Sequence, residues 1–97
     1  MLTHVVLLKF QPGTDRFRLD SLADSLRALP PKIPEIRDYT VGVDIGLADG
    51  NAEVAVIARF DDAEGHAIYT NHPAHRKVIE EQILPVLASR SATQFES

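Results

Sequence analysis

The run that constrains the architecture most is THVVLLKF, residues Thr3–Phe10. Its β-branched and apolar residues end at the turn signal Gln11-Pro12-Gly13, and together these features predict a β-strand. Side chains alternate between the two faces of a strand. Here both alternating sets are largely apolar: His4, Val6, Leu8 and Phe10, and Thr3, Val5, Leu7 and Lys9. We therefore expect both faces of this strand to be covered by other parts of the protein.

The next segment has the spacing of an amphipathic helix. Thr14 or Asp15 offers an N-cap, and Pro30-Pro31 ends the helix. Between them, apolar residues recur three or four positions apart, at Leu19, Leu22, Leu26 and Leu29. The pattern predicts one helix directly after the first strand.

Two further strands are predicted after this helix. Residues 37–45 alternate, with Tyr39, Val41 and Val43 on one face. Asp49-Gly50-Asn51 is a hairpin turn signal. Residues 53–60 then form a strand that is again apolar on both faces. These two strands should pair as an antiparallel hairpin.

A second helical region is predicted to be interrupted near its middle. Asp61 or Asp62 can cap a helix that runs to about residue 69 or 70. Pro73 suits the first turn of a second helical piece, because its missing N–H would have no helical partner there. That piece runs to about residue 84 or 87, and a weaker final strand covers residues 88–95.

The resulting order, β-α-β-β-α-β, is the ferredoxin-like α+β pattern within a single domain of residues 1–97. It predicts an antiparallel four-stranded sheet with both helices on one face. Two helices leave the second, apolar face uncovered, and such a face is larger than monomers usually expose. The simplest cover is the same sheet of a second copy, in a two-fold homodimer. The alternative is a long loop or terminal segment folded over the sheet, for which the chain has no spare segment.

Composition excludes several classes of function. The formal net charge is −4 and the ten Lys and Arg residues are scattered, which argues against a nucleic-acid partner. The absence of cysteine excludes disulfides, thiolate nucleophiles and cysteine-ligated metals. No run approaches the roughly 18 apolar residues of a membrane span, and residues 1–4 lack the basic region of a secretory signal. We expect a cytoplasmic protein with no membrane partner.

The segment Tyr69–His75, YTNHPAH, is the strongest candidate for chemistry. It places a phenol and two imidazoles within seven residues at the predicted helix break, and histidine exchanges protons near neutral pH. His75 shares a helical face with Val78 and Ile79, so it should point toward the sheet. There it could act as a general base or acid, or be a core histidine satisfied by a backbone carbonyl.

The other candidates each carry two interpretations. The Tyr69 hydroxyl could donate to a substrate carbonyl or oxyanion, or could merely reach a partner while the ring fills space. His72 should shape the turn and cap the following helix, and is a candidate ligand contact. His4 lies either against a pocket under the helices or in the dimer interface. His66 is predicted to lie on a solvated helix face.

No metal or cofactor is predicted. His4, His72 and His75 offer the three protein ligands of a catalytic zinc, but Pro73 separates two of them and no carboxylate lies among them. Walker-type and dinucleotide-binding glycine loops and the serine nucleophile elbow are absent. Two cations, Lys9 and Arg59, interrupt apolar strand faces. They should extend their charged ends to the rim of the paired sheets, or meet an anionic group of a ligand.

Four segments together carry a resemblance to a known family: His4–Phe10, Ile33–Ile36, Phe60–Asp62 and Tyr69–His75. In order and spacing the chain resembles the stress-responsive α/β-barrel domain (Dabb) family, within the dimeric α/β-barrel superfamily. The resemblance implies two ferredoxin-like subunits packed sheet against sheet, each with a pocket between its sheet and its helices.

One plant branch of this family is a group of polyketide cyclases, which close linear poly-β-keto acids by an aldol reaction. Its tyrosine and histidine stand in the same Tyr-x-x-His-Pro-Ala-His arrangement. The resemblance therefore implies catalytic roles for Tyr69 and His75 and a ligand-binding place for His4. Residues 76–81 are charged where the plant branch is more apolar.

Two hypotheses follow from these observations. The first is a pocket that performs acid/base chemistry without a cofactor on a small keto or phenolic acid, as a polyketide cyclase or a cofactor-free monooxygenase does. In it His75 removes a proton and Tyr69 steadies the enolate oxygen. The second is a non-catalytic dimeric module, made under stress, that binds a ligand or a protein.

Overall fold

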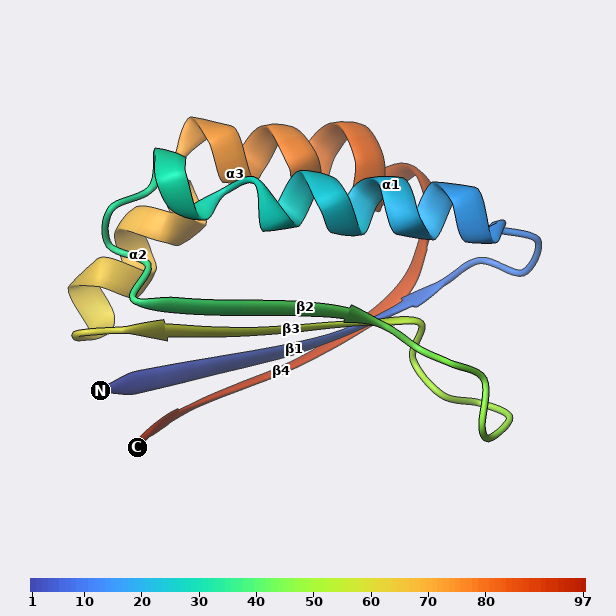
Figure 1. Ribbon diagram of the computed structural model, residues 1–97, viewed down its shortest axis with the longest axis horizontal. Helices are drawn as coiled ribbons and strands as arrows, with labels where there is room; N and C mark the ends of the chain where they lie inside the picture. Colours follow the sequence, from blue (N-terminus) through green and yellow to red (C-terminus); the bar gives the residue numbers. More distant parts are fainter.

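The computed structural model, which describes residues 1–97, is a four-stranded antiparallel sheet with every helix on one face (Figure 1). The strand order is β2-β3-β1-β4. In chain order the elements are β1 (Leu2–Phe10), α1 (Arg16–Arg27), β2 (Asp38–Val43), β3 (Val54–Phe60), α2 (Ala63–Asn71), α3 (Pro73–Val78) and β4 (Leu87–Glu96). The ferredoxin-like fold is confirmed, and the strand ends lie within two residues of those predicted.

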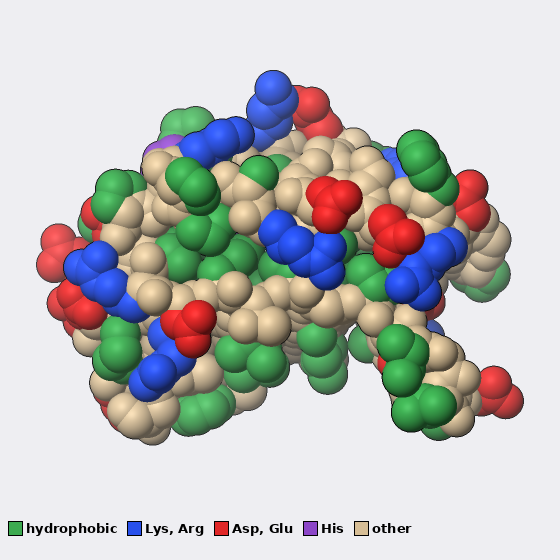
Figure 2. All heavy atoms as spheres, in the orientation of Figure 1, with side chains coloured by type: hydrophobic (Ala, Val, Ile, Leu, Met, Phe, Trp, Pro, Cys, Tyr) green, Lys and Arg blue, Asp and Glu red, His purple; other side chains and the backbone are tan.

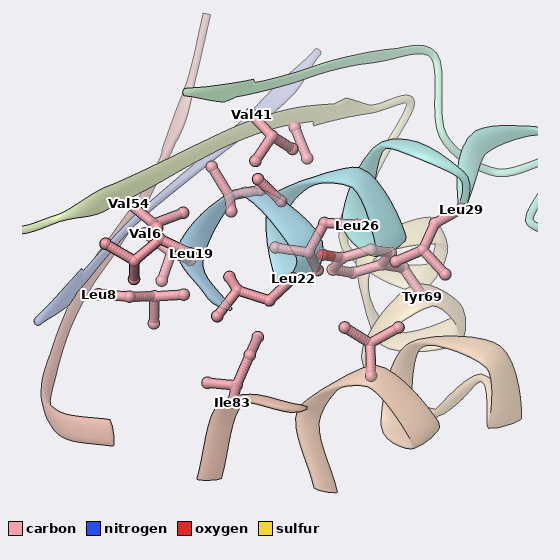
Figure 3. Packing of buried hydrophobic residues seen from close by; sticks show 14 of the residues in the cluster. Val6, Leu8, Leu19, Leu22, Leu26, Leu29, Val41, Val54, Tyr69 and Ile83 are labelled. Carbon is pink, nitrogen blue, oxygen red and sulfur yellow. The ribbon is translucent and has the colours of Figure 1, made fainter. Parts of the chain in front are cut away.

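The first helix lies across the sheet as its apolar spacing requires. The Asp15 carboxylate accepts the backbone N–H of Arg18 at 2.8 Å, which confirms the predicted N-cap. After α1 the chain leaves through a 3₁₀ turn at Pro30–Lys32. The leucines of the helical stripe and the facing strand residues form one buried cluster, part of which Figure 3 shows: Val6, Leu8, Leu19, Leu22, Leu26, Leu29, Val41 and Val54 among them.

Strand β1 is central, and its register decides which side chains face the helices. His4 pairs with Ala58 of β3 and Gln94 of β4. Leu8 pairs with Val54 and Arg90 in the same way. His4 is 4% exposed, on the same face as the buried residues Val6, Leu8 and Phe10. The two alternatives for His4 are therefore resolved in favour of the helix-covered face.

The opposite face of the sheet carries no helix. Leu7, Ile57 and Phe95 are 45%, 42% and 48% exposed there. The loop between β2 and β3 projects beyond this face, with Ile45 and Leu47 largely exposed. Figure 2 shows hydrophobic side chains along the side of the sheet away from the helices and on the projecting loop. The apolar second face that the sequence indicates is thus uncovered within one chain.

The second helical region breaks where the sequence predicts. The Asp62 carboxylate accepts the Gly65 N–H at 2.9 Å and begins α2. His72 has extended backbone angles between the two helices, and Pro73 occupies the first turn of α3. A π turn at Ile79–Ile83 and a 3₁₀ turn at Leu84–Val86 then carry the chain into β4. None of the helices is long and apolar enough to cross a membrane.

Candidate functional site

A cavity of about 180 Å³ lies between the β1–β4 side of the sheet and the second helical region. Apolar side chains form most of its wall, from Val6 and Leu8 on β1 to Ile79 and Ile83 beyond the helix break. Pockets of this kind bind small molecules through a few well-placed polar groups. The polar lining residues are His4, His66, Tyr69, Thr70, His75, Arg90 and Gln94, and no Asp or Glu is among them.

His75 is held in one tautomer by the helix break. Its Nδ1 lies 3.2 Å from the backbone carbonyl oxygen of Thr70. Because a carbonyl oxygen only accepts, Nδ1 must carry the proton, and Nε2 of the neutral ring is left as an acceptor. Burial lowers the pKa of His75, against an opposing effect of this hydrogen bond, while Arg76 and Arg90 lower it further. His75 is therefore a neutral imidazole with a free basic nitrogen at neutral pH.

His4 is held in the opposite tautomer. The side-chain amide nitrogen of Gln94 lies 2.8 Å from His4 Nδ1. An amide NH₂ only donates, so Nδ1 accepts and the proton of the neutral ring is on Nε2. Burial, followed by the charges of His66 and Arg90, lowers the pKa of His4 to about 4. One cavity thus contains a histidine that can accept a proton and another that can only donate a hydrogen bond.

Tyr69 packs its ring against His75 and directs its hydroxyl to a second tyrosine. The two ring centroids are 4.2 Å apart, and Tyr69 is 3% exposed. Figure 3 shows its ring directed from α2 into the buried cluster. Its hydroxyl oxygen lies 2.9 Å from that of Tyr39 on β2, and either can donate. Burial raises the pKa of both phenols, so both keep their protons at neutral pH.

The pair leaves one hydroxyl proton free. When Tyr39 donates to Tyr69, the Tyr69 hydroxyl keeps its own proton for a further acceptor. The sequence places Tyr39 on one face of its strand with Val41 and Val43, and only the fold brings the two phenols together.

The prediction that His66 lies on a solvated helix face was wrong. His66 is half-buried, lines the cavity, and packs against His4 with ring centroids 4.6 Å apart and the ring planes inclined by 57°. Burial, then the charge of Arg90, lowers its pKa. The signal was present in the sequence, because His66 lies three residues before Tyr69 and positions i and i+3 share a helix face.

The structure brings His4, Tyr69 and His75 together, but it does not bring His72 to the cavity. His72 Nδ1 accepts the backbone N–H of Ala74 at 3.0 Å, so it caps α3 as the local interpretation predicts. No group of three or more His, Asp or Glu side chains is arranged to hold a metal ion.

The cation at the cavity is not one that the sequence singled out. Lys9 donates to the Gly50 carbonyl at 3.2 Å and Arg59 contacts the Ser97 hydroxyl at 3.4 Å, and neither lines the cavity. Arg90 does, together with Gln94. Their signal was the alternation of the final strand, which places residues 90, 92 and 94 on one face.

Comparison with known proteins agrees with this architecture. The sequence matches the Stress responsive A/B Barrel Domain, Dabb, over residues 2–97. The chain belongs to this family. None of the curated proteins matches it.

Solved structures extend the comparison. A dimeric ferredoxin-like protein of unknown function from Thermobifida fusca is 35% identical, with a TM-score of 0.89 over 99% of this chain and 90% of the other. A dimeric protein of unknown function with a ferredoxin-like fold, from Bacteroides fragilis, is 24% identical, with a TM-score of 0.88 over 99% and 95%. A hydroxynitrile lyase from Passiflora edulis is 14% identical, with a TM-score of 0.81 over 97% and 90%. The last two likenesses concern the fold alone.

Proposed function

We propose that this Dabb protein binds a small keto or phenolic acid in the cavity and performs acid/base chemistry on it without a cofactor. The observation that carries the proposal is the pair of opposite tautomers at one small cavity. The Thr70 carbonyl leaves His75 with a free basic nitrogen, and Gln94 leaves His4 with a free N–H. A base and a hydrogen-bond donor facing the same space are what proton removal beside a carbonyl requires.

The proposed reaction begins at a carbon between two carbonyl groups. His75 Nε2 takes a proton from this carbon, and the electron pair of the C–H bond moves into the enolate. The enolate oxygen accepts hydrogen bonds from the Tyr69 hydroxyl and from His4 Nε2–H. The carbanion then attacks a second carbonyl of the same molecule, and the new alkoxide takes the proton back from His75. The sequence resemblance to the plant polyketide cyclases supports this type of reaction.

Size and polarity restrict the substrate. A cavity of about 180 Å³ with apolar walls suits a molecule about the size of one substituted ring. A β-dicarbonyl compound stabilises its own carbanion, so no cofactor is needed. Desolvation keeps His75 neutral near pH 7, as a base must be.

We further propose that the functional unit is a two-fold homodimer formed by the uncovered faces of two sheets. The exposed apolar side chains Leu7, Ile57 and Phe95 support it, because monomeric proteins rarely expose a contiguous apolar surface of this kind to water. The 35% identical relative from Thermobifida fusca is itself described as dimeric. A cytoplasmic location stays a prediction from the sequence.

A second candidate function is a non-catalytic dimeric module of the stress response that binds a ligand or a protein. The projecting loop with the exposed side chains Ile45 and Leu47 favours it, because this loop offers an apolar contact away from the cavity.

A titration separates the two candidates. The imidazole C–H signals are followed by NMR in the wild type and in His75→Ala while small phenolic and β-keto acids are added. We expect one chemical class to shift the His75 signal saturably and to be turned over, and His75→Ala to lower that turnover by roughly two to four orders of magnitude. His72→Asn is the matched control, because it removes an imidazole outside the cavity and keeps a capping side chain. If no compound moves the His75 signal, the binding module is the better description.

A further inference from the structure

Arg90 is the one permanent charge at the cavity. The register of β4 against β1 places Arg90 opposite Leu8 and Gln94 opposite His4, so both side chains face the helices. Between them Ala92, opposite Val6, leaves room. Four residues along a strand span about 13 Å. Along β4, the cavity wall thus carries the Arg90 guanidinium at one end and the uncharged side chains of Gln94 and His4 at the other.

The Arg90 guanidinium has no partner within the chain. Arg16, Arg27, Arg37 and Arg76 each pair with a carboxylate, whereas Arg90, like the exposed Arg18, is in no ion pair and its side chain makes no hydrogen bond. The cavity also lacks any acidic residue that could approach it. The donor fork of an arginine matches a carboxylate in two parallel hydrogen bonds. The Arg90 guanidinium is therefore available to the carboxylate of a ligand.

The local charge contrasts with that of the whole chain. The net charge is −4, yet the imidazoles of His4, His66 and His75 all have lowered pKa values and are neutral around the cavity. Arg90 contributes to the lowering at each of them. Arg90 is exposed to solvent, so an anion meets this single positive charge on the open side of the cavity, next to apolar walls and neutral donors.

We propose that Arg90 binds the carboxylate of the substrate and so orients it in the cavity. The inference rests on the proposed function and specifies its substrate class as a free acid rather than a neutral ketone, amide or ester. With the carboxylate at Arg90, the remainder of the molecule extends along β4 toward His4 and Gln94. Its reactive carbon then lies beneath His75. Arg90 is a specificity-determining residue, and the chemistry stays with His75.

The test compares salicylate with salicylamide, two phenols of nearly the same shape that differ in charge. Binding of each is measured by NMR through the His75 signal and by calorimetry, in the wild type and in Arg90→Gln. We expect Arg90→Gln to weaken salicylate roughly ten- to hundredfold, the range for a hydrogen bond to a charged group, and to leave salicylamide unchanged. Arg90→Lys should restore part of the loss, because a lysine keeps the charge without the paired donors.

Arg18→Gln is the matched control. Arg18 is an exposed arginine on α1, remote from the cavity lining, and its side chain makes no ion pair. Equal salicylate affinity in the wild type and in Arg90→Gln would overturn the role of Arg90 while leaving the proposed function intact. So would equal affinity of the wild type for salicylate and salicylamide. If neither compound moves the His75 signal in the wild type, the proposed function fails and the role of Arg90 fails with it.

Discussion

The backbone carbonyl of Thr70, near the end of α2, accepts a hydrogen bond from Nδ1 of His75, in the first turns of α3, at 3.2 Å. The helix break therefore does more than redirect the chain. It places the end of one helix beside a side chain of the next, and it fixes which nitrogen of the imidazole is free. The Tyr-x-x-His-Pro-Ala-His spacing is the sequence form of this arrangement, with His72 capping and Pro73 starting α3.

The first prediction concerns the pH dependence of turnover. Because His75 acts as a base when neutral, kcat/KM should fall tenfold per pH unit below its pKa, which burial lowers from the ordinary value of 6.5. The acid limb should therefore lie below pH 6.5 and disappear in His75→Gln. Arg90→Gln should move the limb upward, since the charge of Arg90 lowers this pKa. A limb above pH 7 in the wild type would contradict the assignment of His75.

The second prediction concerns stability in acid. The pKa of His4 is about 4 in the folded protein and 6.5 when unfolded, so between these values the unfolded chain binds the extra proton. The free energy of unfolding therefore rises with pH across this window. The contribution of His4 to it is lost as the pH falls from 6.5 to 4. At about 1.4 kcal/mol per pKa unit the loss from His4 is roughly 3 kcal/mol. Lowered pKa values at His66 and His75 act in the same direction.

Urea unfolding at several pH values between 4 and 7 measures this slope. His4→Gln should flatten it. An equally steep slope in His4→Gln would mean that His4 is not the group that resists protonation in the folded state.

Most of the fold follows from the sequence because its signals are local. The apolar runs, the Asp15 and Asp62 caps and the Pro73 restart each depend on a few neighbouring residues, and all lie where predicted. The covered face of β1 could not be assigned in the same way. Both faces of that strand are apolar, so only the pairing with β3 and β4 and the position of the helices decide it.

The site was predictable in its contiguous part and, beyond it, only at His4. Tyr69 and His75 lie in one motif, and both line the cavity. Tyr39 and Gln94 reach their partners from strands 30 and 90 residues away in sequence, and the alternation of those strands gives the face of each side chain but not its partner. Arg90 shows the same limit. A lone cation on an edge strand predicts only a side chain in solvent, and it is the strand register, with Arg90 opposite Leu8, that places it on the helix-covered face.

The third prediction concerns the two tyrosines. Tyr69→Phe and Tyr39→Phe should each lower the free energy of unfolding by about 1–3 kcal/mol, because each leaves a buried hydroxyl without its partner. The double variant should cost less than the sum, since it removes both hydroxyls together. Only Tyr69→Phe should also lower kcat strongly, because Tyr39 does not line the cavity. Denaturant unfolding and steady-state kinetics on the same four proteins measure both effects. An equal loss of kcat in Tyr39→Phe would mean that Tyr39, too, acts on the substrate.

The fourth prediction concerns assembly. Leu7→Lys and Ile57→Lys put a charge on the uncovered face of the sheet, where each side chain is already about half exposed in the single chain. They should therefore leave the subunit folded but weaken the dimer by about 3 kcal/mol or more, because a charge would be buried there without a partner. Phe17→Lys is the matched control, since Phe17 on α1 is 82% exposed on the other side of the molecule. Sedimentation equilibrium at micromolar concentration should find a dimer for the wild type and Phe17→Lys and a monomer for the two sheet variants. If all four proteins sediment alike, the uncovered face is not the interface, and the exposed apolar loop at Ile45 and Leu47 becomes the surface to alter.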